Sequence, residues 1–303
     1  MAILDFQYRT VSPLFLYGAG SALPELRAPS FKGMLRFWWR AVQAEDDIQE
    51  LRRREGEIFG GTGTGEGRSS FSLRIKSGAF GPVMKSLLPH HDLPTYRGQR
   101  RPKVKAIVNH SFQLILSYRD LPQGFSPDHL RALVELSALL GGVGKRSRRG
   151  FGCFQIMACN GKASELLNLA ERVSLRKAVL DRMNLLSGGR YGESDQIIRL
   201  REKCSAHYPY VEEIRIGEGT RNLDVLLTTV GSSSHGNDCG YTGMGGPRGR
   251  LASPEYVSIV RGGAITWPVI TSLHPVFDPK KEKPTADKRE EFRAAILGGA
   301  GET

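Results

Sequence analysis

Four short segments in the first half of the chain have the apolar, largely alternating pattern that predicts β-strands. They are residues 4–11, 70–76, 111–118 and 151–158. Helical segments separate the first strand from the second and the third from the fourth, which gives the order β-α-β-β-α-β. This order is typical of a ferredoxin-like (RRM-like) unit. We therefore expect an α+β fold.

The two helices of this unit are predicted from apolar residues that recur with a period near 3.6. Residues 31–44 form the first helix, and Ser30 is its expected N-cap. The second helix begins at Pro127 after Ser126 and ends at Gly141, because proline favours the first turn of a helix and glycine its end. The segments 60–69 and 79–110 are then long loops, whose length is typical of functional segments.

The second half of the chain has weaker patterns, which predict the order β-α-β-β-α after a leading helix. The expected helices cover residues 163–187, 222–230 and 287–297, and the expected strands cover 212–216, 256–260 and 265–273. A final strand is missing, so we expect a second, degenerate ferredoxin-like domain in tandem with the first. The predicted boundaries are 1–160 and 161–303, and residues 231–250 form another long loop.

The chain of 303 residues carries a formal net charge of +12, which indicates a polyanionic partner such as nucleic acid. No apolar run is long enough to span a bilayer, and the first residues lack the pattern of a signal peptide. The four cysteines are scattered without a C-x-x-C motif, which argues against a zinc site or a disulfide framework. We expect a cytoplasmic protein with free thiols, no cofactor and no bound metal.

The first predicted helix carries a basic face that follows Arg27. Lys32, Arg36 and Arg40 succeed one another at i, i+4 spacing, where like charges repel by roughly 0.2–0.5 kcal/mol per pair. A phosphate chain lying across this face would relieve the repulsion. Trp39 is expected on the same face, where it would stack on an unpaired base. The alternative is that Trp39 belongs to the core and the cations are merely solvated.

A glycine-rich basic loop, GGVGKRSRRGFG, connects the second helix to the fourth strand. Glycine permits positive φ and close approach of a ligand to the backbone. The loop is not a P-loop, because Arg146 follows the Gly-Lys pair and the loop runs from helix to strand. Its backbone N–H groups and cations favour phosphate binding, and a charged surface turn is the alternative. The candidate residues are Gly144, Lys145, Arg146, Arg148 and Arg149.

These two segments resemble the RAMP superfamily of CRISPR RNA-binding proteins. The glycine-rich loop before the last strand is similar to the signature of that superfamily. The run LRAPSFKGMLRFWWRA (26–41), with residues 10–15 before it and 57–60 after it, is similar to the first RAMP subunits of type III-B CRISPR (Cmr) effector complexes. The resemblance covers about residues 5–60 and 137–156.

This resemblance implies a subunit that has two ferredoxin-like domains and no catalytic site of its own. Such subunits lie at one end of a ribonucleoprotein complex, near the 3′ end of the guide RNA, and help to hold guide and target RNA in antiviral defence. The implied partners are guide RNA, target RNA and other RAMP subunits. The implied RNA-binding residues are Lys32, Arg36, Trp39 and Arg40, together with the loop residues 145–149.

Two other functions stay open on the sequence. A metal-independent CRISPR-RNA-processing endoribonuclease would use a histidine for acid–base chemistry, because its pKa lies near neutrality. The candidates, none of them in a recognisable motif, are His110, His129, His207 and His235. A protein scaffold whose charge serves solubility is the other alternative. The neighbours His90 and His91 form a poor metal pair without a third ligand.

Overall fold

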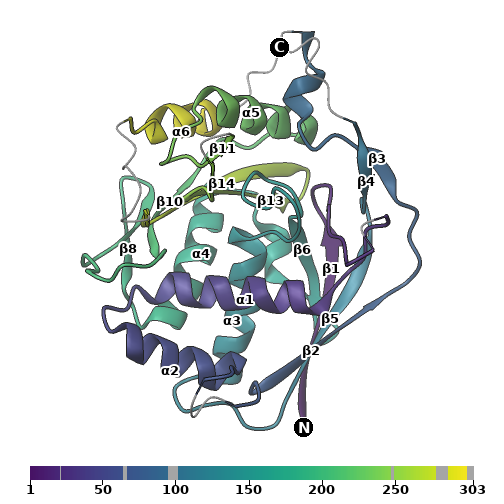
Figure 1. The fold of residues 1–303 in the computed structure, drawn as a ribbon. Coiled ribbons are helices and arrows are strands. Elements are labelled where there is room, and N and C mark those ends of the chain that lie inside the picture. The colour runs from purple at the N-terminus through teal and green to yellow at the C-terminus, as the bar shows by residue number, and fades with distance from the viewer. Residues whose placement is uncertain (21, 64–66, 95–101, 247–248, 278–285, 299–303) are drawn as a thin grey trace.

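The computed structural model describes residues 1–20, 22–63, 67–94, 102–246, 249–277 and 286–298. Two antiparallel five-stranded sheets organise the chain, and helices pack against both (Figure 1). The α+β class is thereby confirmed.

The first sheet holds the strands of the N-terminal half. Its order is β2 (Phe71–Ser77), β5 (Ser111–Tyr118), β1 (Ala2–Thr10), β6 (Phe154–Cys159) and β7 (Lys162–Ala163). Helix α1 (Ala28–Gln43) follows β1, and helix α3 (Pro127–Leu140) follows β5. The four predicted strands and two predicted helices of this half are therefore present in the predicted order.

The start of α1 differs from the prediction. The N-cap is Arg27 rather than Ser30, and it provides no side-chain cap. The helix starts earlier because Pro29 lies in its first turn, where the fixed φ of proline suits the helix and no N–H is lost. The expected N-cap of α3 is confirmed, since the Ser126 hydroxyl accepts a hydrogen bond from the His129 N–H.

A further helix, α2 (Ile48–Phe59), was not predicted. The Asp47 carboxylate caps it by accepting hydrogen bonds from the N–H groups of Gln49 and Glu50. Half of the residues of α2 are charged, so its apolar face is too sparse to give a clear helical period. The segment 79–110 is also partly regular, with a hairpin of β3 (Val83–Lys85) and β4 (Val104–Ala106) and a short 3₁₀ helix, Pro89–Asp92.

The second sheet holds the strands of the C-terminal half. Its order is β13 (Glu255–Gly262), β14 (Ile265–Leu273), β10 (Val211–Ile216), β9 (Ile197–Leu200) and β8 (Tyr191–Ser194). The helices of this half are α4 (Arg172–Ser187), α5 (Leu223–Gly236) and α6 (Arg289–Leu297). The predicted series β-α-β-β-α corresponds to β10, α5, β13, β14 and α6.

The unpredicted β8–β9 hairpin pairs with the free side of β10. Asp195 and Gln196 turn this hairpin with positive φ values of 51° and 63°. Hairpin turns with positive φ are usually predicted from the pairs Asn-Gly or Asp-Gly, and the pair Asp-Gln does not give this signal. The expected loop 231–250 is shorter than predicted, because α5 extends to Gly236 and a small hairpin of β11 (Met244–Gly246) and β12 (Gly249–Leu251) follows.

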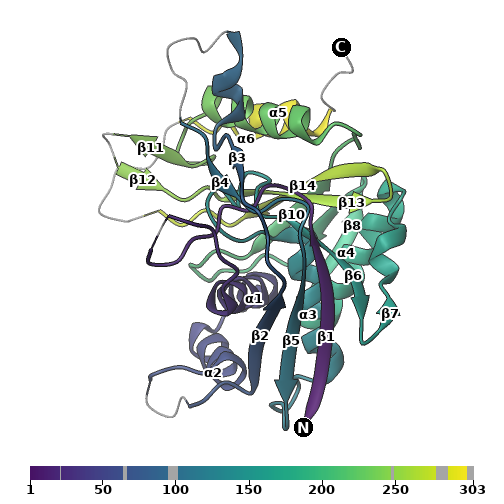
Figure 2. The same ribbon diagram turned by 90° about the vertical axis from the view of Figure 1, so that its right-hand side faces the viewer.

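The second sheet is covered on both faces. Helices α3 and α4 lie on one side of it, and α5 and α6 lie on the other (Figures 1 and 2). Strand β13 is consequently buried along nearly its whole length, and its sequence EYVSIVRG does not alternate between apolar and polar residues. A buried ion pair holds α6 in place, since the Arg293 guanidinium donates to the fully buried Glu255 carboxylate at 2.8 and 3.0 Å.

We predict that Gly152→Ala destabilises the protein much more than Gly161→Ala does. Both glycines have positive φ, which costs an L-residue roughly 1–2 kcal/mol. A Cβ at Gly152 would also stand 2.0 Å from the Val143 carbonyl oxygen, whereas no atom lies within 4 Å of a Cβ at Gly161. Urea denaturation should show an additional loss of about 2 kcal/mol or more for Gly152→Ala. Equal losses in the two variants would contradict this packing.

Candidate nucleic-acid interface

The basic face of α1 is partly neutralised by the neighbouring helix α2. The Glu55 carboxylate, only 4% exposed, accepts a hydrogen bond from Arg36 Nε and lies 3.3 Å from Arg40 Nη1. Arg36 also donates to the Gly60 carbonyl at 3.2 Å. Glu55 therefore relieves, within the protein, the repulsion expected along this face. The sequence pattern did not reveal this buried carboxylate. The two guanidinium groups remain about 40% exposed.

The exposed position expected for Trp39 is wrong. Its side chain is 1% exposed, packs edge-on against Phe59 and has the Arg54 guanidinium over its ring. Helix α2 covers this side of α1 and turns an apparent polar face into a core position. Trp39 is thus unavailable for stacking on a base.

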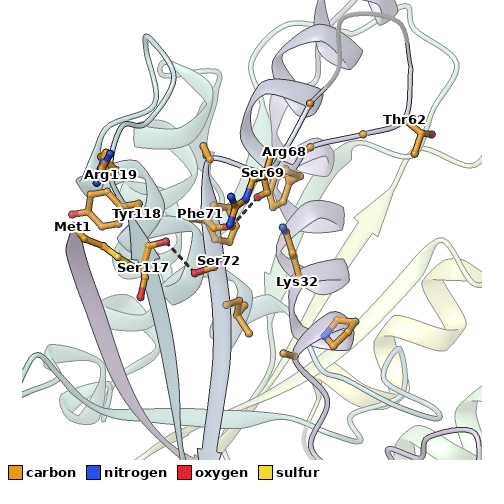
Figure 3. A pocket seen from close by; sticks show the side chains of 18 residues that line it. Met1, Lys32, Thr62, Arg68, Ser69, Phe71, Ser72, Ser117, Tyr118 and Arg119 are labelled. Atoms are coloured by element: carbon orange, nitrogen blue, oxygen red, sulfur yellow. Dashed lines mark hydrogen bonds between the residues drawn. The ribbon is translucent and has the colours of Figure 1, made fainter.

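Lys32 lies in a cavity of about 900 Å³ between the first turns of α1, the 60–70 segment and the end of β5 (Figure 3). Burial and the charge of Arg36 lower the pKa of Lys32. The exposed Arg68 and Arg119 line the same cavity, and none of its described lining residues is acidic. This cavity therefore favours an anion. Neither Arg68 nor Arg119 was predicted, because each is an isolated cation in its own segment.

The glycine-rich loop uses much of its backbone inside the protein. The N–H groups of Lys145 and Gly152 donate to carbonyls of the segment after β1, at 2.9 and 3.0 Å. The N–H of Gly150 donates to Val257 of β13 at 2.9 Å. A Cβ at Gly144, where φ is +91°, would stand 2.5 Å from the Phe15 carbonyl oxygen, so this glycine permits packing rather than ligand approach. The expected cradle of free N–H groups is therefore largely wrong.

The arginines of the loop have different surroundings. Arg149 is buried and donates to the Arg148 and Glu255 carbonyls, each at 2.9 Å, and to Ser234 Oγ at 2.7 Å. Burial, together with the charge of Arg146, lowers the pKa of Arg149 to about 9. Burial also lowers the pKa of Arg146. Arg149 is a structural residue, contrary to its expected role in RNA binding.

Lys145 is the exposed cation of the loop, whereas Arg146 and Arg148 are both half-buried. Lys145 is exposed, with its Nζ 4.8 Å from the centre of the Tyr17 ring. Arg148 is half-buried, donates to the Ser253 carbonyl and lies 5.6 Å from the centre of the Phe37 ring. Arg27, at the start of α1, is paired with Glu25 at 3.1 Å and stays partly exposed.

A groove of about 340 Å³ brings the two segments singled out in the sequence together. Helix α1 contributes Met34 and Phe37, and the loop contributes Gly144, Ser147 and Arg148. The buried Trp38 indole N–H, which has no acceptor among the described residues, belongs to the same groove. Phe37, half-buried against Tyr256, offers the aromatic surface that was expected of Trp39.

Two of the candidate catalytic histidines have hydrogen-bond partners within the protein. The His129 ring completes the capping box of α3, and His110 Nε2 is 2.7 Å from Ser77 Oγ. His207 is exposed and lies near His274, with ring centres 6.4 Å apart. His235 joins His90 and His91, as described below.

Within the described residues, no helix is both long and apolar enough to cross a bilayer. The four cysteines are free, and Cys153 is fully buried in a setting that raises the pKa of its thiol to about 11.

Comparison with known proteins shows the family to which the matched region belongs. The family model of the RAMP superfamily matches residues 7–155, which include β1, α1 and the glycine-rich loop. The chain is a RAMP superfamily protein. The predicted resemblance to this superfamily is confirmed.

Two proteins of Pyrococcus furiosus share sequence with this RAMP protein. The CRISPR system Cmr subunit Cmr1-1 is 29% identical over 152 residues, which cover 48% of this chain and 45% of the relative. The subunit Cmr1-2 is 37% identical over 60 residues, which cover 19% of this chain and 32% of the relative. The chain thus spans less than half the length of the relatives it matches.

Solved structures extend the likeness of fold to nearly the whole chain. The crystal structure of Cmr1 from Pyrococcus furiosus matches with a TM-score of 0.61 and 19% identity, covering 99% of this chain and 100% of the other. A chain in the cryo-EM structure of the type III-B Cmr-beta complex bound to cognate target RNA matches with a TM-score of 0.62 and 10% identity, covering 97% and 99%. The RAMP protein therefore has a Cmr1-like fold.

We predict that Glu55→Ala lowers the free energy of unfolding by roughly 2–3 kcal/mol, because it removes the buried partner of two arginines. Glu57→Ala, on the exposed side of the same helix, should cost less than about 1 kcal/mol. Chemical denaturation of both variants measures the difference. Similar values would show that Glu55 does not neutralise the basic face of α1.

Proposed function

We propose that this RAMP protein is a non-catalytic RNA-binding subunit of a type III-B CRISPR (Cmr) effector complex. In this role it holds guide RNA near its 3′ end, target RNA, or both, in the cytoplasm during antiviral defence. Other RAMP subunits are its protein partners. The Cmr1-like fold supports the assignment to such a complex, and the surface around α1 supports the binding of RNA.

The proposal is supported by two hollows on either side of the first turns of α1, namely the cavity that contains Lys32 and the groove that contains Arg148. The larger contains Lys32, Arg68 and Arg119, and the smaller contains Arg148 beside Phe37. None of the described lining residues of either hollow is acidic. Cations without carboxylate neighbours favour a polyanion over a protein surface of mixed charge.

The two hollows suit different parts of a nucleotide chain. Phosphates would lie in the larger one, because its cations face open space and the N-terminal end of α1 adds partial positive charge. An unpaired base would lie in the smaller one, against the Phe37 ring and the Arg148 guanidinium plane. Single-stranded RNA, whose bases are free to stack, fits this division better than a duplex.

We predict that reversing two exposed cations, Arg119 of the larger hollow and Lys145 of the glycine-rich loop beside the smaller one, with Arg119→Glu and Lys145→Glu together, weakens binding of single-stranded RNA by about tenfold or more at physiological salt. The salt dependence of log K should also fall by about 1.4, from two lost phosphate contacts. Fluorescence anisotropy over a range of salt concentrations measures both effects. Arg36 and Arg40 are unsuitable for this test, because reversing them would place new carboxylates beside buried Glu55.

The matched control is Lys162→Glu with Lys177→Glu, which makes the same change of charge at exposed positions outside both hollows. The control should keep most of its affinity. An equal loss of RNA affinity in the two double variants would show that net charge alone determines the binding. Failure of the wild-type protein to bind RNA, alone and in the assembled complex, would favour a protein scaffold.

We also predict that the purified protein leaves labelled CRISPR-repeat RNA intact in the presence of EDTA. The four candidate histidines lie in separate places, and none of them lines either hollow. Gel analysis of the RNA after incubation provides the measurement. Cleavage that is abolished by a single substitution at His110, His129, His207 or His235 would overturn the non-catalytic assignment.

A further inference from the structure

Three histidines from distant parts of the chain meet at one place. His90 and His91 lie in the 3₁₀ helix Pro89–Asp92, and His235 lies at the end of α5. A possible ligand nitrogen from each ring lies within 4.8 Å of those of the other two. The ring centres of His90 and His91 are 4.5 Å apart, and each lies 5.7 Å from that of His235.

Local packing brings these rings together. The 3₁₀ helix packs against α5, and the His90 ring lies against the backbone of Gly231, where a Cβ would stand 2.3 Å from Nδ1. His90 and His91 are 2% and 7% exposed, while His235 is exposed. The cluster thus has two buried ligands and one exposed ligand.

We propose that His90, His91 and His235 bind a zinc ion, with a fourth position open to solvent. Three imidazoles and an open site are a common ligand set for Zn²⁺. Nitrogens around a tetrahedral zinc at about 2.05 Å stand roughly 3.3 Å apart, so the present cluster must contract slightly. Rotation of the exposed His235 side chain provides this movement.

Arg146 of the glycine-rich loop acts electrostatically on His90. Its positive charge opposes a bare cation but stabilises an anion, such as hydroxide or phosphate, at the open position of the metal. The zinc would link the 3₁₀ helix Pro89–Asp92 to α5. This inference does not depend on the proposed binding of RNA.

The test uses the full-length chain without an affinity tag, stripped with EDTA and then mixed with ZnCl₂. After gel filtration, elemental analysis should find about one zinc per wild-type chain and less than about 0.2 in His235→Ala. Zinc at a hundredfold excess over its dissociation constant should raise the Tm of the wild type by roughly 5 °C and leave that of His235→Ala unchanged.

The control is His207→Ala, which removes an exposed histidine outside the cluster and should bind zinc as the wild type does. Co²⁺ in place of zinc should give the intense visible absorption of a tetrahedral site in the wild type and in this control. Substoichiometric zinc in the wild type, or equal retention by His235→Ala, would overturn the proposal. His235 is exposed, so its replacement does not threaten folding.

Discussion

The pairing of the glycine-rich loop with β13 is the interaction on which the rest of the structure depends. Gly150 donates to the Val257 carbonyl, and Val257 donates back to Arg148 at 3.1 Å, so the loop runs as a short extra strand beside the second sheet. The Arg149 guanidinium extends this pairing by donating to the Glu255 carbonyl. This pairing joins the glycine-rich loop of the first half to the second sheet and fixes where the remaining loop cations emerge.

The distribution of charge follows from this constraint and from α2. Some basic residues are occupied within the protein, as Arg36 and Arg40 are by Glu55 and Arg149 is by carbonyl oxygens. Others line a cavity that has no acidic residue among its described lining, as Arg119 does. A net charge of +12 therefore describes two populations of cations, and the second population is the one that can meet a polyanion.

The sequence predicted elements with a strong period and missed those that depend on distant contacts. The strands and helices of the first half and the order of the second were predictable from local pattern. Helix α2 was not, because its stability comes from a carboxylate buried against α1 and from few apolar residues. The hairpin beside β10 was not, because its Asp-Gln turn lacks glycine.

The candidate interface was located correctly as two segments but only partly as residues. Periodicity places Trp39 on a polar face of α1, but α2 covers that face, and the half-buried Phe37 lines the groove instead. Likewise, the sequence separates His90 from His235 by more than a hundred residues, and no local spacing reveals that they meet. Long-range packing decides both outcomes.

We propose that RNA lies along the first turns of α1 and the glycine-rich loop. Photocrosslinking of RNA in the assembled effector complex, with the modified residues mapped by mass spectrometry, tests it most directly. We expect crosslinks at Phe37 and at neighbouring residues of the two hollows, such as Tyr118 and Tyr256. Crosslinks confined to other surfaces, such as β7 or the exposed side of α4, would contradict it.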